Sequence, residues 1–297
     1  MRAKLASRLV GEQLEASLPA GLGDLSLSCP PGYCAVFRIF QNHIFSTATN
    51  LQGVEKMAGK DVLIVYAHQE PKSLNGSFKT LTVEELKKQG CTVTVSDLYE
   101  MQFEPRTTKK DIVGELYNPD HFNYGTEVWK AYENGCLTED LIEEQKKVNK
   151  ADLVIFQFPL YWFSMPAILK GWMDRVLVQG FAHDFPKCYD SGLLKNKLAL
   201  LSFTTGGDED MYSRRGPSDN IRYLLWPIQH GILHFCGFSI LSPQICFAPE
   251  VRRRRKKQGK GSFPSGGVFS KKGAPILPER ANGWTQLWRI IGIGFFS

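Results

Sequence analysis

The chain has 297 residues, of which 43% are hydrophobic and 22% charged, a composition typical of globular proteins and not of disordered or fibrous ones. No apolar run approaches the roughly 20 residues of a membrane-spanning helix. The net charge of +6 is uneven, because residues 251–297 hold eleven Lys and Arg against one acid and leave residues 1–250 at −4. The basic balance therefore says nothing about the main part of the chain.

The seven cysteines are odd in number, scattered and without a C-x-x-C spacing. This pattern favours reduced thiols in a cytosolic protein over a disulfide framework. Near the N-terminus, Arg2, Lys4 and Arg8 are a feature of mitochondrial presequences, but Glu12 and Glu15 weaken that interpretation. We therefore expect a cytoplasmic protein.

Three segments differ in pattern. Residues 1–56 show no sustained period, and we expect a disordered extension upstream of a natural start at Met57. Residues 57–250 alternate strand and helix patterns and are expected to form the folded domain. Residues 251–297 begin with a run of six basic side chains and continue with Gly, Ser and Pro, which predicts a disordered basic tail.

The strand and helix patterns of the middle segment follow one another from Asp61–His68, which predicts the first strand. A polar loop leads to a helix that ends near Gln89, with Gly90 as its stop. After the second strand, a long, loop-rich region extends to about Gly135. The further predicted elements are a strand over Cys91–Ser96, a helix over Thr138–Lys150, a strand over Leu153–Phe158, a helix over Ala167–Leu177, a strand over Lys197–Phe203, a helix over Asn220–Cys236 and a strand over Ser239–Phe247.

Five strands with intervening helices predict a doubly wound α/β fold around one parallel sheet. By analogy with flavodoxin-like proteins, we expect the strand order 2-1-3-4-5 in a single domain with irregular terminal extensions. In such sheets, ligands bind at the carboxyl ends of the strands.

The most informative segment is Ala151–Pro166. It begins with an apolar run that is typical of a central strand buried on both faces. The run stops at Pro159, the aromatic residues 161–163 follow, and a helix begins after Pro166. An aromatic cluster at the end of a parallel strand would suit a flat aromatic ligand such as a flavin.

Two other predicted strands end in loops that could bind a ligand. The loop His68–Ser77 holds one Lys and several Ser or Asn side chains, which suit a phosphate at a helix N-terminus, although an ordinary helix cap explains them equally well. Thr204–Gly207 would allow close backbone approach and N–H donation, although a generic turn is the alternative. Tyr212 could add a phenol, although a lone Tyr is more often a packing residue.

His230 and His234 stand four residues apart on one predicted helix, a spacing able to hold a metal. Two ligands do not close a tetrahedral site, and no H-E-x-x-H pattern accompanies them, so two partly buried histidines with hydrogen-bond partners are the alternative. The basic run at 252–257 could bind nucleic acid, although such runs are more often simply solvated.

From Met57 to about Glu250, the amino-acid sequence resembles those of the mammalian NAD(P)H:quinone oxidoreductases. Residues 226–231 and 244–250 place the chain closest to the branch that uses dihydronicotinamide riboside. The resemblance is carried by Lys60–Ser73, Phe156–Ser164, Thr204–Gly207, Met211–Tyr212 and His234–Phe238.

The resemblance implies an FAD-containing homodimer that reduces quinones by two electrons in a ping-pong reaction. A reduced nicotinamide, preferably dihydronicotinamide riboside but also NAD(P)H, would deliver hydride and leave before the quinone enters the same slot. Tyr212, Gly206 and Gly207 would stabilise the reduced cofactor. The implied FAD contacts are His68, Ser73, Asn75, Ser77, Pro159, Leu160, Tyr161, Trp162, Phe163, Thr204, Thr205, Gly206, Gly207, Tyr212 and Glu250.

The resemblance also implies a substrate pocket and a metal site. Phe235 would line the quinone pocket together with Phe185 and His183, and His230 and His234 match two ligands of a site that could hold zinc.

The chain departs from the family at several of these positions. His183 and Cys188 stand where the family has apolar or aromatic pocket residues, and Ser218 stands where it has a His or an Asn. The third metal ligand of the family, a Cys, aligns with Glu279, and no Cys follows Cys246. We therefore expect an incomplete metal site, and the pocket departures leave open which quinone and which nicotinamide donor are used.

The leading hypothesis is an FAD-dependent quinone reductase. One alternative is a catalytically impaired flavin-binding or flavin-free variant whose basic tail contacts nucleic acid or protein. A second alternative is an FMN electron carrier of flavodoxin type, which fits the fold but not the aromatic cluster.

Overall fold

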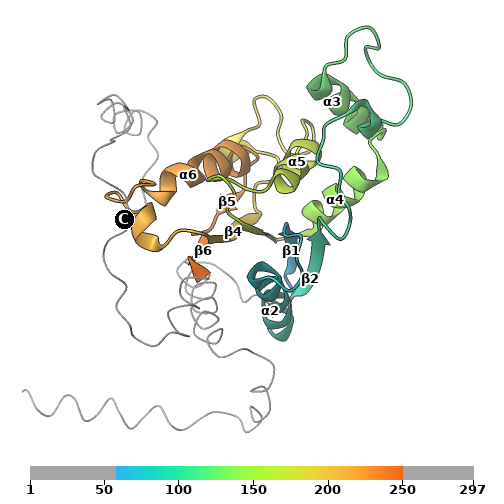
Figure 1. Ribbon diagram of the computed structural model, residues 1–297. Coiled ribbons are helices and arrows are strands. Elements are labelled where there is room, and N and C mark those ends of the chain that lie inside the picture. The colour runs from blue at the N-terminus through green and yellow to red at the C-terminus, as the bar shows by residue number, and fades with distance from the viewer. Residues whose placement is uncertain (1–57, 250–297) are drawn as a thin grey trace, which may run out of the picture. The chain divides into compact units, whose positions relative to one another are not determined.

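The computed structural model describes residues 58–249, so the expected extension (1–56) and tail (251–297) lie outside it. Within the described residues, no helix has both the length and the apolar character needed to cross a membrane. This part of the chain is a layered α/β structure in which helices cover both faces of a parallel sheet (Figure 1).

The sheet has the strand order β2-β1-β3-β4-β5, with every neighbouring pair parallel. This confirms the predicted doubly wound, flavodoxin-like fold and its strand order. The central strand β3 is buried along its whole length, as its apolar run predicts. The five strands are β1 (Asp61–Tyr66), β2 (Thr92–Asp97), β3 (Leu153–Pro159), β4 (Leu198–Thr205) and β5 (Ser239–Ile240).

Two short strands replace the single strand predicted at residues 239–247. β5 pairs with the beginning of β4, and β6 (Gln244–Phe247) pairs with its end. Leu241 still donates its N–H to the Ala199 carbonyl at 2.9 Å, but Pro243 has no N–H and cannot continue the ladder. The prediction of one continuous strand is therefore wrong.

The loop-rich region before residue 135 contains a helix that the sequence analysis did not predict. α3 (Tyr124–Asn134) begins where Asn123 Oδ1 accepts the N–H of Thr126 at 3.1 Å, and it ends at Gly135, whose φ is 67°. Both boundaries follow ordinary helix chemistry. The remaining helices of the described residues, apart from those at 221–234, are α2 (Leu74–Lys88), α4 (Glu139–Lys150), α5 (Ala167–Val176) and the 3-10 turns η1 (Lys109–Asp111), η2 (Tyr189–Ser191) and η3 (Glu209–Tyr212).

The helix predicted over residues 220–236 is divided in two. α6 (Ile221–Ile228) contains Pro227 and continues into a π-helical segment, η4 (Gln229–His234). Because Pro227 has no N–H to donate to the preceding turn, the regular hydrogen-bond ladder is interrupted just before the wider π turn begins.

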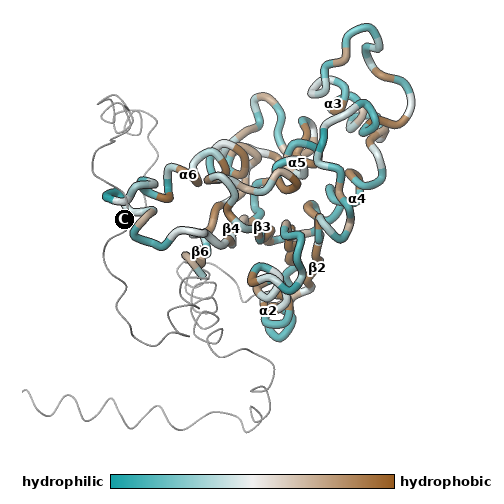
Figure 2. The backbone as a smooth tube through the Cα atoms, in the orientation of Figure 1, coloured by the Kyte–Doolittle hydropathy of each residue, from teal (hydrophilic) through white to brown (hydrophobic). Residues whose placement is uncertain are grey.

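Two apolar layers flank the sheet. Side chains alternate along β1, so that Val62 and Ile64 pack in the layer covered by α2, whereas Leu63 and Val65 pack in the larger layer with α4 and α5. Figure 1 shows α2 on one side of the strands and α5 and α6 on the other. Hydrophobic residues concentrate along the central strands, and the outer turns of α2 are hydrophilic (Figure 2).

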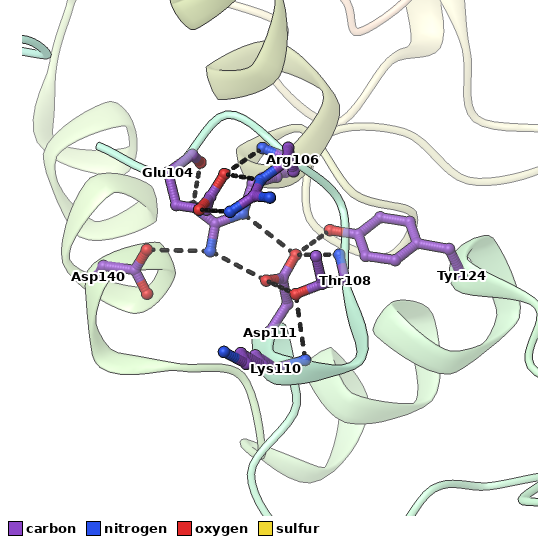
Figure 3. Close-up of polar contacts among 8 residues, drawn as sticks. Glu104, Arg106, Thr108, Lys110, Asp111, Tyr124 and Asp140 are labelled. Carbon is purple, nitrogen blue, oxygen red and sulfur yellow. Dashed lines mark hydrogen bonds and ion pairs between the residues drawn. The ribbon is translucent and has the colours of Figure 1, made fainter. Parts of the chain in front are cut away.

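A buried ion pair fastens α5 to the segment before α3. Arg175 Nε and Nη2 each donate to Asp111 at 3.1 Å, and Nη1 donates to the Glu104 carbonyl at 2.7 Å. Tyr124 donates its hydroxyl to Asp111 at 2.6 Å, as the close-up shows (Figure 3). Burial, together with this bond to the carboxylate, raises the pKa of the Tyr124 phenol. The cluster thus joins the connection before α3 to α3 and α5.

Replacing Arg175 with Met should lower the free energy of unfolding by about 3–5 kcal/mol, because it leaves the Asp111 carboxylate buried without its counter-charge. Urea unfolding at pH 7 measures this. Arg106→Met is the matched control, since Arg106 forms its ion pair with Glu104 at the surface and should leave the midpoint unchanged. Equal effects of the two substitutions would contradict the assigned role of the buried pair.

Candidate functional site

The carboxyl ends of β1, β3 and β4 lie at one edge of the sheet, because these neighbouring strands are parallel. Tyr66 aligns with Gln157, and Pro159 aligns with Thr204. The loops that follow these three strands carry most of the predicted cofactor residues. The candidate site is therefore this edge of the sheet, where ligands of open α/β sheets bind.

The loop between β1 and α2 is fixed by its own hydrogen bonds. Ser73 Oγ accepts the N–H of Gly76 at 3.0 Å, and Ser77 Oγ donates to the Ser73 carbonyl at 3.1 Å. A Cβ on Gly76 would lie 2.0 Å from the Pro71 carbonyl oxygen, so glycine alone permits this close approach. The loop is thus a capped and rigid entry into α2, with the helix N-terminus at the edge of the sheet.

His68 begins this loop with a defined imidazole orientation. The N–H of Glu70 donates to His68 Nδ1 at 2.9 Å, and partial burial lowers the pKa of the imidazole. The neutral ring that accepts at Nδ1 carries its proton on Nε2. His68 can therefore offer an N–H donor to a ligand at this edge.

The aromatic residues after β3 form a tight two-residue turn. Tyr161 and Ser164 exchange two backbone hydrogen bonds of 2.9 Å, and Trp162 and Phe163 between them have φ of 47° and 58°. Positive φ at both central positions is usual for Asn and Gly, and it costs other residues about 1–2 kcal/mol each. The Trp162 side chain is nonetheless 96% exposed. Strain combined with an exposed indole indicates a functional turn.

The loop after β4 packs against this turn through Tyr212. The Tyr212 ring meets Phe163 edge-on with centroids 6.4 Å apart, and it lies 5.8 Å from the Phe247 ring. A Cβ on Gly207 would lie 2.8 Å from Met211 Sδ, whereas a Cβ on Gly206 would meet nothing within 4 Å among the described residues. The backbone at Gly206 is thus open to an approaching ligand.

Burial raises the pKa of the Tyr212 phenol, and a hydrogen bond with the Gly207 backbone partly offsets that effect. The phenol therefore stays protonated near neutral pH and can act as a donor. Thr205 Oγ1 donates to the Gly207 carbonyl at 2.7 Å, which holds the glycine turn in place. Leu160 donates its N–H to the Thr204 carbonyl at 2.8 Å and joins the two loops.

A second aromatic group contains the predicted substrate residues. The His183 ring lies 5.1 Å from the Phe235 ring, and Tyr189 meets Phe235 edge-on at 5.3 Å. The Phe185 side chain is 75% exposed. His183 Nδ1 is buried and has no hydrogen-bond partner among residues 58–249, and burial lowers the pKa of this imidazole.

The two histidines of η4 face each other. Their Nδ1 atoms are 3.3 Å apart, and His234 Nε2 lies 3.0 Å from Asp190 Oδ1. The His230 ring stacks on Trp226 at 3.9 Å. No group of three potential metal ligands occurs within residues 58–249. Both the predicted hydrogen-bonded pair and the predicted incomplete metal site are compatible with this arrangement.

Several residues at the site were not found from the sequence. Tyr189 and Phe247 contact predicted site residues, but isolated aromatics in loops or edge strands carry no local signal. Gln157 did carry a signal, since it is the one polar residue in the apolar run that became β3. The predicted contact Glu250 lies outside the described residues.

Comparisons with known proteins show the family of the chain and its fold. Residues 60–260 match the family described as the flavodoxin-like fold. Ribosyldihydronicotinamide dehydrogenase (quinone) of Rattus norvegicus is 66% identical over 202 residues, which cover 68% of this chain and 87% of the relative. The Homo sapiens protein of the same name is 66% identical over 203 residues, which cover 68% of this chain and 88% of the relative. A solved putative quinone reductase from Klebsiella pneumoniae is 39% identical, with a TM-score of 0.62 over 65% of this chain and 77% of that one.

His183→Phe should raise the free energy of unfolding by about 1 kcal/mol at pH 8, because it removes a buried ring nitrogen without a partner. Burial holds the pKa of His183 in the folded chain below its value in the unfolded chain. Below about pH 6.5 the unfolded chain therefore binds more protons, and the free energy of unfolding decreases as the pH is lowered. The substitution should weaken this fall. Urea unfolding of both proteins between pH 5 and 8 measures it, and parallel pH profiles would contradict it.

Proposed function

The chain belongs to the flavodoxin-like fold family and, within it, to the ribosyldihydronicotinamide dehydrogenases (quinone), and we propose that it reduces quinones with a reduced nicotinamide through FAD at the carboxyl edge of its sheet. The cofactor is a flavin. The observation that carries the proposal is the meeting of the strained aromatic turn and the two-glycine loop at Tyr212.

The residues present fit a flavin. Trp162 offers an exposed indole beside Phe163, and the backbone at Gly206 is open to a ligand, since no described atom lies within 4 Å of where a Cβ would stand. At the other end of the edge, the capped N-terminus of α2 suits a phosphate, because helix N–H groups and the helix dipole favour an anion. The residues proposed to hold FAD are His68, Ser73, Asn75, Ser77, Pro159, Leu160, Tyr161, Trp162, Phe163, Thr204, Thr205, Gly206, Gly207 and Tyr212.

A bound flavin would supply two-electron redox chemistry between the nicotinamide and the quinone. The chain's own contribution is positioning and electrostatics. Tyr212, with its raised pKa, and the N–H groups of Gly206 and Gly207 are preorganised donors for negative charge that develops on a ligand. The indole of Trp162 gives a flat surface on which aromatic rings stack in a fixed orientation.

The substrates are proposed to contact His183, Phe185 and Phe235. The imidazole of His183 is neutral near pH 7 because burial lowers its pKa, so it presents a hydrogen-bonding group without a charge. Phe235 and the exposed Phe185 add apolar surface that suits a quinone ring. The order of binding is proposed to be ping-pong, with dihydronicotinamide riboside preferred over NAD(P)H.

The described residues do not complete a structural zinc site, because His230 and His234 lack further ligands within residues 58–249. Any metal held there would be bound weakly. We further propose a homodimer, supported by the exposed Phe185 side chain on a single chain, and a cytoplasmic location, supported by scattered cysteines without a C-x-x-C spacing. Sedimentation equilibrium tests the dimer.

The absorption spectrum of the purified full-length chain tests the proposed function. A flavin band that bleaches with dihydronicotinamide riboside under anaerobic conditions, and returns on addition of menadione, is the expected result. A chain that takes up no flavin on incubation with FAD would contradict it. Bleaching to a stable one-electron semiquinone would instead favour an electron carrier.

Replacing Trp162 with Ala should weaken FAD binding about tenfold or more, because base–aromatic and ring stacking contribute about 1–3 kcal/mol. Trp162→Gly should weaken FAD binding to the same extent, but it should leave the flavin-free chain about 1 kcal/mol more stable than Trp162→Ala, since glycine tolerates positive φ. Fluorescence titration with FAD and urea unfolding measure the two effects. Unchanged FAD affinity in both variants would remove the stacking role.

A further inference from the structure

Three polar side chains are buried at the centre of the candidate site. Gln157 on β3 is 2% exposed, Asn75 in the first turn of α2 is 3% exposed, and Thr204 at the end of β4 is 8% exposed. Gln157 is surrounded by apolar neighbours on its own strand. A buried amide without partners would cost about 1–3 kcal/mol, so its hydrogen bonds decide whether this position is tolerable.

The three side chains form a chain of hydrogen bonds that runs in one direction. Gln157 Nε2 donates to Asn75 Oδ1 at 2.7 Å, and Asn75 Nδ2 donates to Thr204 Oγ1 at 3.0 Å. Because the Thr204 oxygen accepts from Asn75, its own proton points away from Asn75. Through these two hydrogen bonds, the side-chain NH2 group of Gln157 thus determines how the Thr204 hydroxyl is oriented.

We propose that Gln157 is a positioning residue that orients the Thr204 hydroxyl as a donor toward the flavin ring. This inference rests on the proposed function. Gln157 is 2% exposed and donates to Asn75, so it would act through Asn75 and not by contact with the cofactor. Its amide donor sets the Asn75 carboxamide with its oxygen toward β3 and its nitrogen toward β4.

The same chain joins the two ends of the site. Asn75 lies in the first turn of α2, at the end of the site proposed for the phosphates, and Thr204 lies at the end of β4, at the end proposed for the flavin ring. Gln157 therefore links the two ends through Asn75. Neutral amides make this link without a buried charge, which is less costly than an ion pair in the middle of a sheet.

The test measures FAD affinity and the reduction potential of the bound cofactor in Gln157→Met, Thr204→Val and the double variant. Each single variant should bind FAD about tenfold more weakly, as expected for loss of one oriented hydrogen bond, and should have a lower potential because a donor to the reduced form is lost. The double variant should match Thr204→Val, since both substitutions remove the same donor.

Gln145→Met is the matched control. Gln145 on α4 is also buried, and its Nε2 donates to the carbonyl of Val176, the last residue of α5, at 3.1 Å and not to a residue of the three loops. It should lose similar stability in urea without any change in FAD affinity or potential. Equal behaviour of Gln157→Met and Gln145→Met, with FAD bound as in the wild type, would overturn the positioning role.

Gln157→Glu gives a second readout that is independent of packing. A carboxylate cannot donate to Asn75, whereas a protonated carboxyl group can, and burial raises the pKa of such a group. FAD affinity of this variant should therefore fall about tenfold as the pH rises through that pKa, with the wild type flat over the same range. A flat profile in the variant would overturn the proposal alone. Failure of the wild-type chain to bind FAD would overturn the proposed function as well.

Discussion

The parallel register of β1, β3 and β4 is the constraint on which the candidate site depends. Because Tyr66 aligns with Gln157 and Pro159 with Thr204, three separate loops begin at the same edge of the sheet. The two apolar layers hold this register, since a shift of one residue along β1 would exchange the side chains that pack in each layer. The buried amide of Asn75 then ties the first turn of α2 to Gln157 on β3 and to Thr204 at the end of β4.

Conformational strain is placed where the protein is proposed to act. Trp162 and Phe163 adopt positive φ in a turn that exposes the indole, an arrangement that costs stability and buries little by itself. Packing of Phe163 on Tyr212 and the backbone bonds of Tyr161 to Ser164 keep the turn in this form. A ligand that stacks on Trp162 meets a surface that is already oriented, so little ordering entropy opposes binding.

The fold followed from the sequence because apolar runs bounded by glycine or proline specify buried strands, and four of the five predicted strands were confirmed as continuous. The errors arose at Pro243 and Pro227, where one missing N–H divides an element, and at α3, whose cap residue Asn123 lies in a polar stretch. The contact of Phe163 with Tyr212 could not be predicted from local pattern, since contacts between distant loops leave none, and only the family resemblance assigned both residues to one site. Gln157 could have been singled out as a polar residue in an apolar strand.

Hydrogen–deuterium exchange of the full-length chain, with and without FAD, tests the location of the site most directly. FAD should slow exchange in three segments, residues 68–77, 161–164 and 204–207, and should leave the edge strand β2 unchanged. These segments are distant in the sequence and share only the carboxyl edge of the sheet. Protection confined to other segments, or no protection by saturating FAD, would contradict the central claim that this edge is the cofactor site.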